Sequence, residues 1–350
     1  MSIYNVDGDI LYSAKNIVGE SIRFAYDLSG NVIAAETYDI SNVVSYYQAE
    51  TLAMQSEIDA LSDDWQTFVF ITDPHSPANQ QHSQAIALYL LANSKADKII
   101  LGGDIVDSIW PQNYSLFVTP FRESYLKDNI YCVMGNHETF GGGYASAASA
   151  IYNDFLADKT GLSGNLQDNY WYFDDSERKV RWVFLNTSDG RKTDSAATAA
   201  VTVSNDQLTW LQNAIVLPDS SWSLLVIGHV TIYGQYGSVN FTGNVSNGAD
   251  VISAINQCNG DVIGYFCGHQ HVNAVSDTGL FYQATMRCDR FENTNYYGLS
   301  YTERVAGTRT EQSVEVVSFN TKTKDVLIRG IGGGNADGDL NARMSFNYRR

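Results

Sequence analysis

The sequence predicts an α/β domain built around a largely buried sheet, and three observations predict this class. Short apolar runs recur from about residue 66 onward, and helix-like stretches separate them. These runs are continuously apolar, which is typical of strands that are covered on both faces. Most of these apolar runs end in Asp, Asn or His, which are residue types that bind metals. A chain of 350 residues is long enough for one large domain with an appendage, or for two modest domains.

The expected strands and helices alternate along the chain. Six buried strands are expected at 67–72, 98–103, 130–135, 181–186, 223–228 and 261–266. Helices are expected at 79–94, 111–127, 146–158, 205–215 and 248–257. This alternation indicates α/β layering. The tail 313–333, SVEVVSFNTKTKDVLIRGIGG, predicts a hairpin that turns near 321–324 and joins the edge of a sheet.

The segment before residue 65 differs from the rest. Residues 1–40 contain three related stretches, YNVDGDIL, YDLSGNVI and YDISNVVS (the last running on to residue 45), which predict short hairpin-like units too small for a core of their own. Residues 41–64 predict a helix with a heptad seam at Ile40, Val44, Tyr47, Thr51, Met54, Ile58 and Leu61. Two interpretations remain open: a short coiled coil, with a homotrimer through 40–61, or one amphipathic helix lying on the main domain 65–350.

Composition excludes several classes of function. The formal net charge of −17 argues against general nucleic-acid binding, which depends on basic side chains that neutralise phosphates. No apolar run approaches the roughly 20 residues that span a bilayer. The first residues lack the pattern of a signal peptide, so we expect synthesis in the cytoplasm. Four scattered cysteines do not form a disulfide framework, and Cys132 and Cys267 are expected to be buried thiols.

Metal-binding residue types gather at the ends of the expected strands. They are Asp73 and His75 in ITDPH, Asp104 and Asp107 in GGDIVD, Asn136 and His137 in GNHE, His229 in IGHV, and His269 and His271 in CGHQH. Ligands of open α/β sheets bind beyond the carboxyl ends of the strands, so these side chains are expected at one rim. Each motif alone is weak, because a single Asp-x-His is usually a cap or a surface pair. Their order and concentration together predict a metal site.

This ordered set resembles the calcineurin-like metallophosphoesterase family, of a bacterial or prophage type. All five motifs occur in family order within residues 67–271, and QLTWL (207–211) and IRGIGGG are similar to segments of some bacterial members. The resemblance implies a four-layer β-sandwich flanked by helices, with two metal ions at one edge. It also implies that Asp107 replaces the metal-binding tyrosine of purple acid phosphatases, so a tyrosinate–iron site is not expected.

The resemblance also implies a role for each motif residue. Asp73, His75 and His271 would hold one metal, Asn136, His229 and His269 the other, and Asp104 would bridge them. His137 would face the substrate and assist the leaving group, and Asp107 would orient a ligand. The metals would be two divalent or trivalent ions chosen among Mn, Fe, Zn, Co and Ni.

The function expected from this resemblance is hydrolysis of a phosphodiester, or of a phosphomonoester, by a hydroxide that bridges the metals. Asn136, Arg287 and Arg290 are the expected substrate contacts, although the Arg- and Tyr-rich segment 287–310 also fits a solvated loop. His82 is expected at the surface. The N-terminal segment suggests a phage-tail, virion or surface enzyme acting on a phosphate polymer. The alternative is a receptor-binding or structural appendage that keeps the fold without catalysis.

Overall fold

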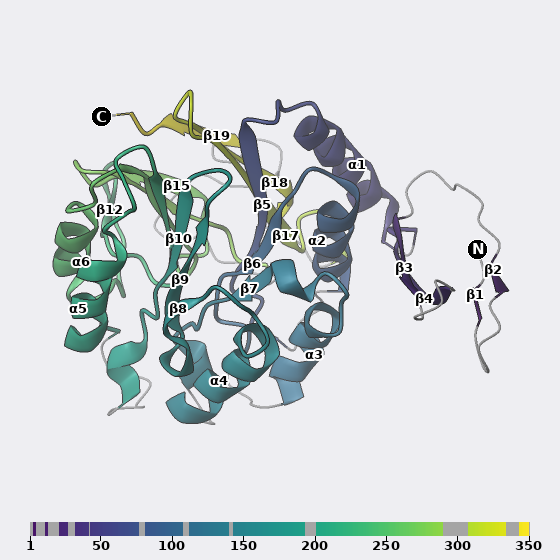
Figure 1. Cartoon of the computed structure of the whole chain (residues 1–350), viewed down its shortest axis with the longest axis horizontal. Coiled ribbons are helices and arrows are strands. Elements are labelled where there is room, and N and C mark those ends of the chain that lie inside the picture. Colours follow the sequence, from purple (N-terminus) through teal and green to yellow (C-terminus); the bar gives the residue numbers. More distant parts are fainter. Residues whose placement is uncertain are drawn as a thin grey trace.

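The structure is a computed structural model. It describes residues 3–4, 11–12, 21–26, 32–41, 43–76, 81–107, 112–139, 143–192, 201–289, 307–333 and 343–349. Two large mixed sheets lie side by side with helices on their outer faces, so the architecture has four layers (Figure 1). The predicted fold class is therefore confirmed.

The first sheet has six strands in the order β19-β18-β17-β5-β6-β7. Its parallel centre is β5 (Trp65–Ile71), β6 (Lys98–Leu101) and β7 (Ile130–Cys132). The predicted C-terminal hairpin forms β17 (Ser313–Asn320) and β18 (Asp325–Gly332), and β17 pairs antiparallel with β5. The hairpin thus joins the edge of the parallel strands as expected, and β19 (Arg343–Asn347) covers its outer side.

The second sheet has seven strands in the order β15-β16-β14-β11-β10-β9-β8. Its parallel part contains the expected strands β10 (Val180–Phe184), β11 (Ser223–Ile227) and β14 (Asp261–Cys267), together with β16 (Tyr282–Thr285). Antiparallel strands complete both edges: β8 (Ser163–Asn165), β9 (Tyr170–Asp175) and β15 (Ala274–Asp277). A separate small hairpin pairs β12 (Gln235–Tyr236) with β13 (Val239–Asn240).

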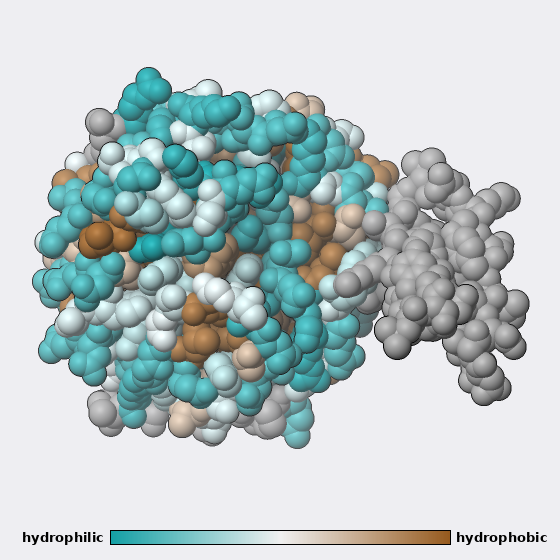
Figure 2. Space-filling model, in the orientation of Figure 1, coloured by the Kyte–Doolittle hydropathy of each residue, from teal (hydrophilic) through white to brown (hydrophobic). Residues whose placement is uncertain are grey.

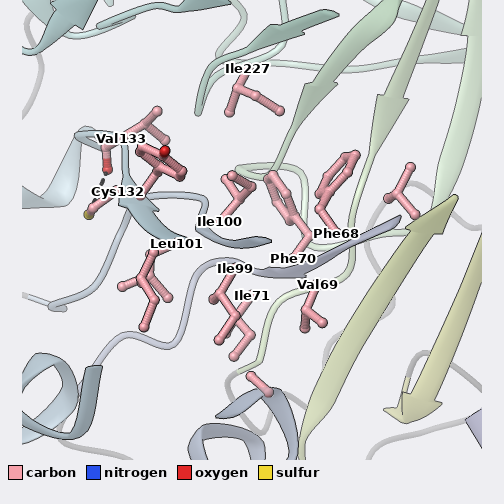
Figure 3. Close-up of a cluster of buried hydrophobic side chains, with 14 of the residues drawn as sticks. Phe68, Val69, Phe70, Ile71, Ile99, Ile100, Leu101, Cys132, Val133 and Ile227 are labelled. Carbon is pink, nitrogen blue, oxygen red and sulfur yellow. Dashed lines mark hydrogen bonds between the residues drawn. The ribbon is translucent and has the colours of Figure 1, made fainter. Parts of the chain in front are cut away.

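The core forms because side chains alternate across the parallel strands. Figure 3 shows Phe68, Phe70 and Ile100 on the side that faces Ile227 of β11, and Val69, Ile71 and Ile99 on the opposite side. The Phe68 ring lies 5.3 Å from the ring of Trp182 and 5.6 Å from that of Phe266, both of the second sheet. One face of each central strand therefore packs against the other sheet and the opposite face against helices, which explains why both faces are apolar.

The helices cover the two outer faces. The six α-helices are α1 (Ser45–Asp59), α2 (Gln81–Asn93), α3 (Gln112–Arg122), α4 (Tyr144–Ile151), α5 (Asn205–Ala214) and α6 (Gly248–Ile255). Figure 1 shows α1, α2 and α3 beside the first sheet and α5 and α6 beside the second. A π-helix, Tyr152–Leu156, extends α4, so the predicted helix 146–158 is one continuous segment of two kinds.

The heptad seam is buried inside this chain. Tyr47, Thr51, Met54 and Ile58 form the buried face of α1, which packs on α2 and β18. Val44 lies before the helix and is exposed, whereas Val43 is buried in its place. The amphipathic-helix interpretation therefore describes α1. The trimer expected through 40–61 gains no support, because Tyr47, Thr51, Met54 and Ile58 are buried within the chain.

The N-terminal segment contains two short antiparallel pairs. β1 (Ile3–Tyr4) pairs with β2 (Leu11–Tyr12), and β3 (Ser21–Tyr26) pairs with β4 (Val32–Tyr38). These pairs agree with the expected hairpin-like units. The turns predicted between the strands lie outside the described residues.

The surface agrees with an acidic globular chain. Figure 2 shows hydrophilic side chains over most of one face, with hydrophobic side chains gathered in a few small areas. Within the described residues, every helix is too short or too polar to cross a membrane.

Replacing Ile58 by alanine tests the packing of α1. Ile58 is fully buried, so Ile58→Ala should lower the free energy of unfolding by about 2–5 kcal/mol. Leu52 on the same helix is 44% exposed, and Leu52→Ala should cost less than about 0.5 kcal/mol. Denaturant unfolding with light scattering measures both effects. Equal costs in the two variants, or a trimer that Ile58→Ala dissociates, would contradict intrachain packing of the seam.

Candidate metal centre

Parallel strands of both sheets deliver the predicted donors to one rim. Asp73 and His75 follow β5, and Asp104 follows β6. Asn136 and His137 come after β7, at the start of the 3₁₀ turn His137–Thr139. The second sheet contributes its donors after β11 and β14: His229, His269 and His271. The sequence-based expectation of a common rim is met in space.

Five of these donors adopt a left-handed backbone. The φ angles are 53° for Asp73, 46° for His75, 50° for Asp104, 67° for His269 and 58° for His271. A residue with a Cβ in this region costs of order 1–3 kcal/mol, so it persists only where its surroundings impose it. The conformation turns each chain sharply at the end of its strand and aims the side chain back over the rim. Such strain gathered at one place indicates a functional site.

Hydrogen bonds between the turns hold them in this shape. The Asp73 amide donates to the Gly103 carbonyl at 2.9 Å, and the His75 amide donates to the Asp104 carbonyl at 3.1 Å. The Gly268 amide donates to the His229 carbonyl at 3.0 Å. Gly268 leaves no space for a side chain, because an added Cβ would lie 2.3 Å from Asp73 Oδ2. The turns within each sheet are therefore held together, and Gly268 lets the turns of the two sheets approach closely.

Asp73 and Asp104 each accept hydrogen bonds from the turns with one carboxylate oxygen and direct the other oxygen toward the centre. Asp73 Oδ2 accepts from the His269 amide at 2.9 Å and from the Thr72 hydroxyl at 2.6 Å. Asp104 Oδ1 accepts from the His137 amide at 2.7 Å. The remaining oxygens, Asp73 Oδ1 and Asp104 Oδ2, face imidazoles.

The distances between donor atoms are those of a crowded polar centre. Asp73 Oδ1 lies 3.2 Å from His271 Nε2 and 3.8 Å from both His75 Nε2 and His229 Nε2. Asp104 Oδ2 lies 3.1 Å from His229 Nε2. Three groups have ligand atoms within 4.8 Å of one another: Asp73, His75 and His271; His75, Asp104 and His137; and Asp104, His229 and His269. Two of these groups share Asp104, which agrees with an aspartate between two ions.

Backbone carbonyls fix which imidazole nitrogen faces the centre. His229 Nδ1 lies 2.7 Å from the Gly102 carbonyl oxygen, which leaves Nε2 toward the two aspartates. His269 Nε2 lies 3.1 Å from the Gly243 carbonyl oxygen, which leaves Nδ1 as its ligand atom. Such contacts orient metal-binding histidines and select the tautomer that can bind.

The chemistry of these donors fits metal cations. Asp73 Oδ1, Asn136 Oδ1 and His229 Nε2 are buried, and within the described structure none of the three makes a hydrogen bond of good geometry, although Asp73 Oδ1 lies 3.2 Å from His271 Nε2 and His229 Nε2 lies 3.1 Å from Asp104 Oδ2. Leaving a buried polar atom unsatisfied costs about 1–3 kcal/mol, so such atoms usually have a role. Imidazole, amide and carboxylate donors together suit Mn, Fe, Zn, Co and Ni. A positive ion among them would satisfy all three atoms.

The protonation of the centre is strongly perturbed. Burial favours the neutral form of Asp73, but His229 and His271 outweigh it and hold the pKa of that carboxyl well below its usual range. Burial lowers the pKa of His75 and of His269 to about 4, although the charges of Asp73 and Asp104 act to raise it. Burial also disfavours charge on His229, but Asp104 and Asp73 raise its pKa to about 9. A metal would replace that proton, because imidazole binds metals in its neutral form.

His137 and Asp107, the two residues expected to be catalytic, lie beside the donors. The His137 side chain is 27% exposed, and its Nε2 lies 3.9 Å from Asp104 Oδ2. Its Nδ1 lies 2.6 Å from the Asp107 carbonyl oxygen. The Asp107 carboxylate lies 3.6 Å from His75 Nδ1, on the far side of that ring from Asp73. The His137 side chain is therefore on a partly open side of the centre, and the Asp107 carboxylate lies near His75 without a hydrogen bond to its Nδ1.

Glu138 is the residue that the sequence reasoning missed. It is fully buried and accepts from three backbone amides: Gly135 at 2.6 Å, Asp104 at 3.0 Å and Val106 at 3.2 Å. It thereby joins the turn after β6 to the turn after β7. Burial, and then the charge of Asp104, raise its pKa to about 7. The sequence contained a signal for this residue, because Glu138 is the last residue of the GNHE motif and directly follows the expected site residues Asn136 and His137.

Of the two expected substrate arginines, the structure describes Arg287, and this residue is buried. Arg287 is only 2% exposed, and its guanidinium donates to the Gly333 carbonyl. This burial gives no support to a phosphate contact by Arg287. Arg290 lies outside the described residues. His82 is partly buried on α2, with its ring 5.5 Å from the Tyr47 ring and away from the donors.

Comparison with known proteins agrees with this geometry. The family model of calcineurin-like phosphoesterases matches residues 66–273, which include every predicted metal ligand. The chain is a member of this family. No curated protein is significantly similar to the chain in sequence.

Three solved structures are similar to this chain at low sequence identity. GAP50, the anchor in the inner membrane complex of Plasmodium, matches with a TM-score of 0.51 and 14% identity over 82% of this chain and 90% of its own. A candidate 5′-nucleotidase from Staphylococcus aureus matches with a TM-score of 0.44 and 12% identity, over 73% of this chain and 51% of its own. Phosphopantetheinyl hydrolase from Mycobacterium tuberculosis matches with a TM-score of 0.41 and 12% identity, over 65% of this chain and 91% of its own.

Adding metal should stabilise the folded phosphoesterase domain. A cation that binds only the native state at 100 times its Kd contributes about 2.7 kcal/mol, so the Tm of chelator-treated protein should rise with at least one of Mn²⁺, Fe²⁺, Zn²⁺, Co²⁺ and Ni²⁺. Asp73→Asn should abolish the rise, whereas Asp63→Asn, at a side chain that is 97% exposed, should keep it. Unchanged melting with all five metals would contradict the site.

Glu138→Ala should loosen the centre without removing a ligand. Three buried amides would lose their acceptor, at about 1–3 kcal/mol each, and metal affinity should fall by about 10–100-fold. Glu177→Ala, at an exposed position before β10, is the matched control and should behave as the parent protein. Denaturant unfolding and metal titration followed by elemental analysis give the two readouts. Parent-like metal affinity in Glu138→Ala would rule out the positioning role.

Proposed function

We propose that this chain is a phosphoesterase that uses two metal ions. One observation supports this proposal above all: imidazole, amide and carboxylate donors from both sheets converge at one rim, with buried donor atoms left unsatisfied. Asp73, His75 and His271 would hold one ion, and Asn136, His229 and His269 the other. Asp104 would lie between them, since it shares a donor group with His75 and another with His229 and His269.

The bound ions would polarise phosphate oxygens and lower the pKa of a water molecule toward neutrality. The protein's own residues would do the rest. The His137 side chain is 27% exposed, against 15% for His271, so its Nε2 would be accessible to give a proton to the departing oxygen. The Asp107 carbonyl, 2.6 Å from His137 Nδ1, would hold that ring in the required orientation.

The substrate class follows from the family and the residues together. We propose a phosphodiester, with a monoester as the second choice, and a surface phosphate polymer as the natural form. The support for the polymer is limited to the N-terminal hairpin-like units, which resemble attachment segments. Asn136 would also contact the substrate through its position beside His137.

The alternative is a binding or structural protein that keeps the fold. GAP50 is described as an anchor, and it shares the fold with this chain at a TM-score of 0.51. The complete donor set argues against this alternative, because a protein without turnover has no need to keep seven ligands and the strain that places them.

His137→Ala should separate metal binding from turnover. In protein loaded with Mn²⁺ or Zn²⁺, hydrolysis of bis(p-nitrophenyl) phosphate should fall by about 10²–10⁴-fold in kcat while the metal content is unchanged. His82→Ala, a histidine on α2 away from the centre, should keep parent activity. Loaded protein that hydrolyses none of a panel of mono-, di- and polymeric phosphates would favour the non-catalytic alternative.

Replacing either histidine of CGHQH should deplete a different ion. His271 belongs to the Asp73 and His75 group, and His269 belongs to the Asp104 and His229 group. His271→Ala and His269→Ala should therefore each lower the metal content from about two ions per chain toward one. Loading with two different metals shows which ion is lost. Loss of the same metal in both variants would refute the assignment of one histidine to each ion.

A further inference from the structure

A second pocket lies apart from the donors, between the edge of the seven-stranded sheet and helix α5. Its volume is about 650 Å³, which is the size of a site for an oligomeric small molecule. Residues of β8 and of the turn after it form one wall, and the C-terminal half of α5 forms the other. Four aromatic side chains line it: Tyr152, Tyr170, Tyr172 and Trp210.

The polar lining of this pocket is neutral. No charged side chain is among its eleven lining residues, although the chain contains 39 acidic and 22 basic residues. Its polar side chains are Ser163 and the carboxamides of Asn165, Gln167 and Asn213. A carboxamide both donates and accepts hydrogen bonds, so it suits hydroxyl groups, which also do both. A neutral lining does not suit a phosphate or another free anion.

The aromatic rings are fixed before any ligand arrives. The Trp210 ring lies 5.0 Å from that of Tyr170, tilted by 55°, and 6.3 Å from that of Tyr172. On its other side, Tyr172 packs at 4.0 Å against the Arg181 guanidinium, which Asp174 holds through two hydrogen bonds of 2.6 and 2.8 Å. Because the rings already pack on one another, they leave no slot between two parallel faces for a planar base. They present instead a rigid surface, which lowers the entropic cost of binding.

We propose that this pocket binds a neutral saccharide. A pyranose ring has an apolar face of C–H groups and a rim of hydroxyl groups, and it would lie against the part of Trp210 that lines the pocket. The carboxamides of Gln167 and Asn213 would bond its hydroxyls. Asn213 Nδ2 already donates to the Thr209 carbonyl at 2.9 Å, so the amide is held in place and its oxygen is the group for a hydroxyl donor. Both carboxamide side chains are exposed and accessible to a ligand.

The saccharide pocket shares one lining residue with a neighbouring pocket, and that neighbouring pocket includes a residue hydrogen-bonded to a proposed metal ligand. Gln167 also lines a neighbouring pocket of about 590 Å³ that extends to Arg191. Arg191 Nη1 donates to the carbonyl of Asn136, one of the proposed metal ligands, at 3.3 Å. If the proposed function holds, a phosphate ester joined to sugars could occupy both sites at once. The saccharide site itself does not depend on metal, so its test is made without metal.

The test uses the full chain after chelator treatment, with saturation-transfer NMR. The probes are cellotriose, maltotriose and N,N′,N″-triacetylchitotriose, with uridine and adenosine as planar competitors. We expect at least one trisaccharide to receive saturation. We also expect Trp210→Ala to weaken its binding by about tenfold or more, equivalent to about 1.4 kcal/mol. The double variant Gln167→Ala/Asn213→Ala should weaken it too, and Gln212→Ala, an exposed neighbour on α5 outside the pocket, should not.

Three outcomes would overturn the proposal. The first is no saturation of any of the three trisaccharides. The second is equal binding by the parent protein and by the double carboxamide variant, which decides the matter even where Trp210→Ala fails to fold. The third is binding of a nucleoside that the trisaccharides do not displace. Loss of phosphoesterase activity does not enter these outcomes, so failure of the proposed function and failure of this site are distinguishable.

Discussion

The site depends on one constraint, which is that each donor must turn into the centre immediately after its strand ends. The left-handed backbone of Asp73, His75, Asp104, His269 and His271 makes this turn, and it is unfavourable for all five. What offsets the cost is the surrounding structure: amides of one turn bond to carbonyls and carboxylates of the next, across both sheets. The apolar strands below hold those turns at fixed separations. The buried sheets therefore act as the rigid support on which a strained polar rim is built.

Much of this arrangement could be predicted from sequence, because the responsible signals are local. Continuous apolar runs identified six of the parallel strands, β5, β6, β7, β10, β11 and β14, but not β16, and strand–helix alternation identified the layers. The donors were recognisable since they directly follow those strands. The edge strands β8, β9, β15 and β19 were not predicted, because they are short or contain polar residues that resemble loops. The heptad seam of α1 predicted a helix but not the surface on which it packs. The same apolar stripe can pack against other helices of a coiled coil or against the surface of its own domain.

Other features of the centre could not be read from the sequence for a physical reason. The carbonyls of Gly102 and Gly243, which orient His229 and His269, are backbone groups, and any residue supplies them. The role of Glu138 depends on three amides from two turns meeting it in space. The burial of Arg287 likewise reflects where its strand ends in the fold, whereas its charge alone suggested a phosphate contact. Long-range geometry decides all of these.

The wide separation of the donors along the chain also has a kinetic consequence. Asp73 and His271 are almost 200 residues apart, and they meet only after both sheets have formed and packed. An ion therefore has nowhere to bind with full coordination in the early stages of folding, when only local contacts exist. Metal would act late, on a structure already complete, so its stabilisation would appear as slower unfolding with little change in the folding rate. The centre would thus govern how long the folded enzyme lasts, and the apolar strands how quickly it forms.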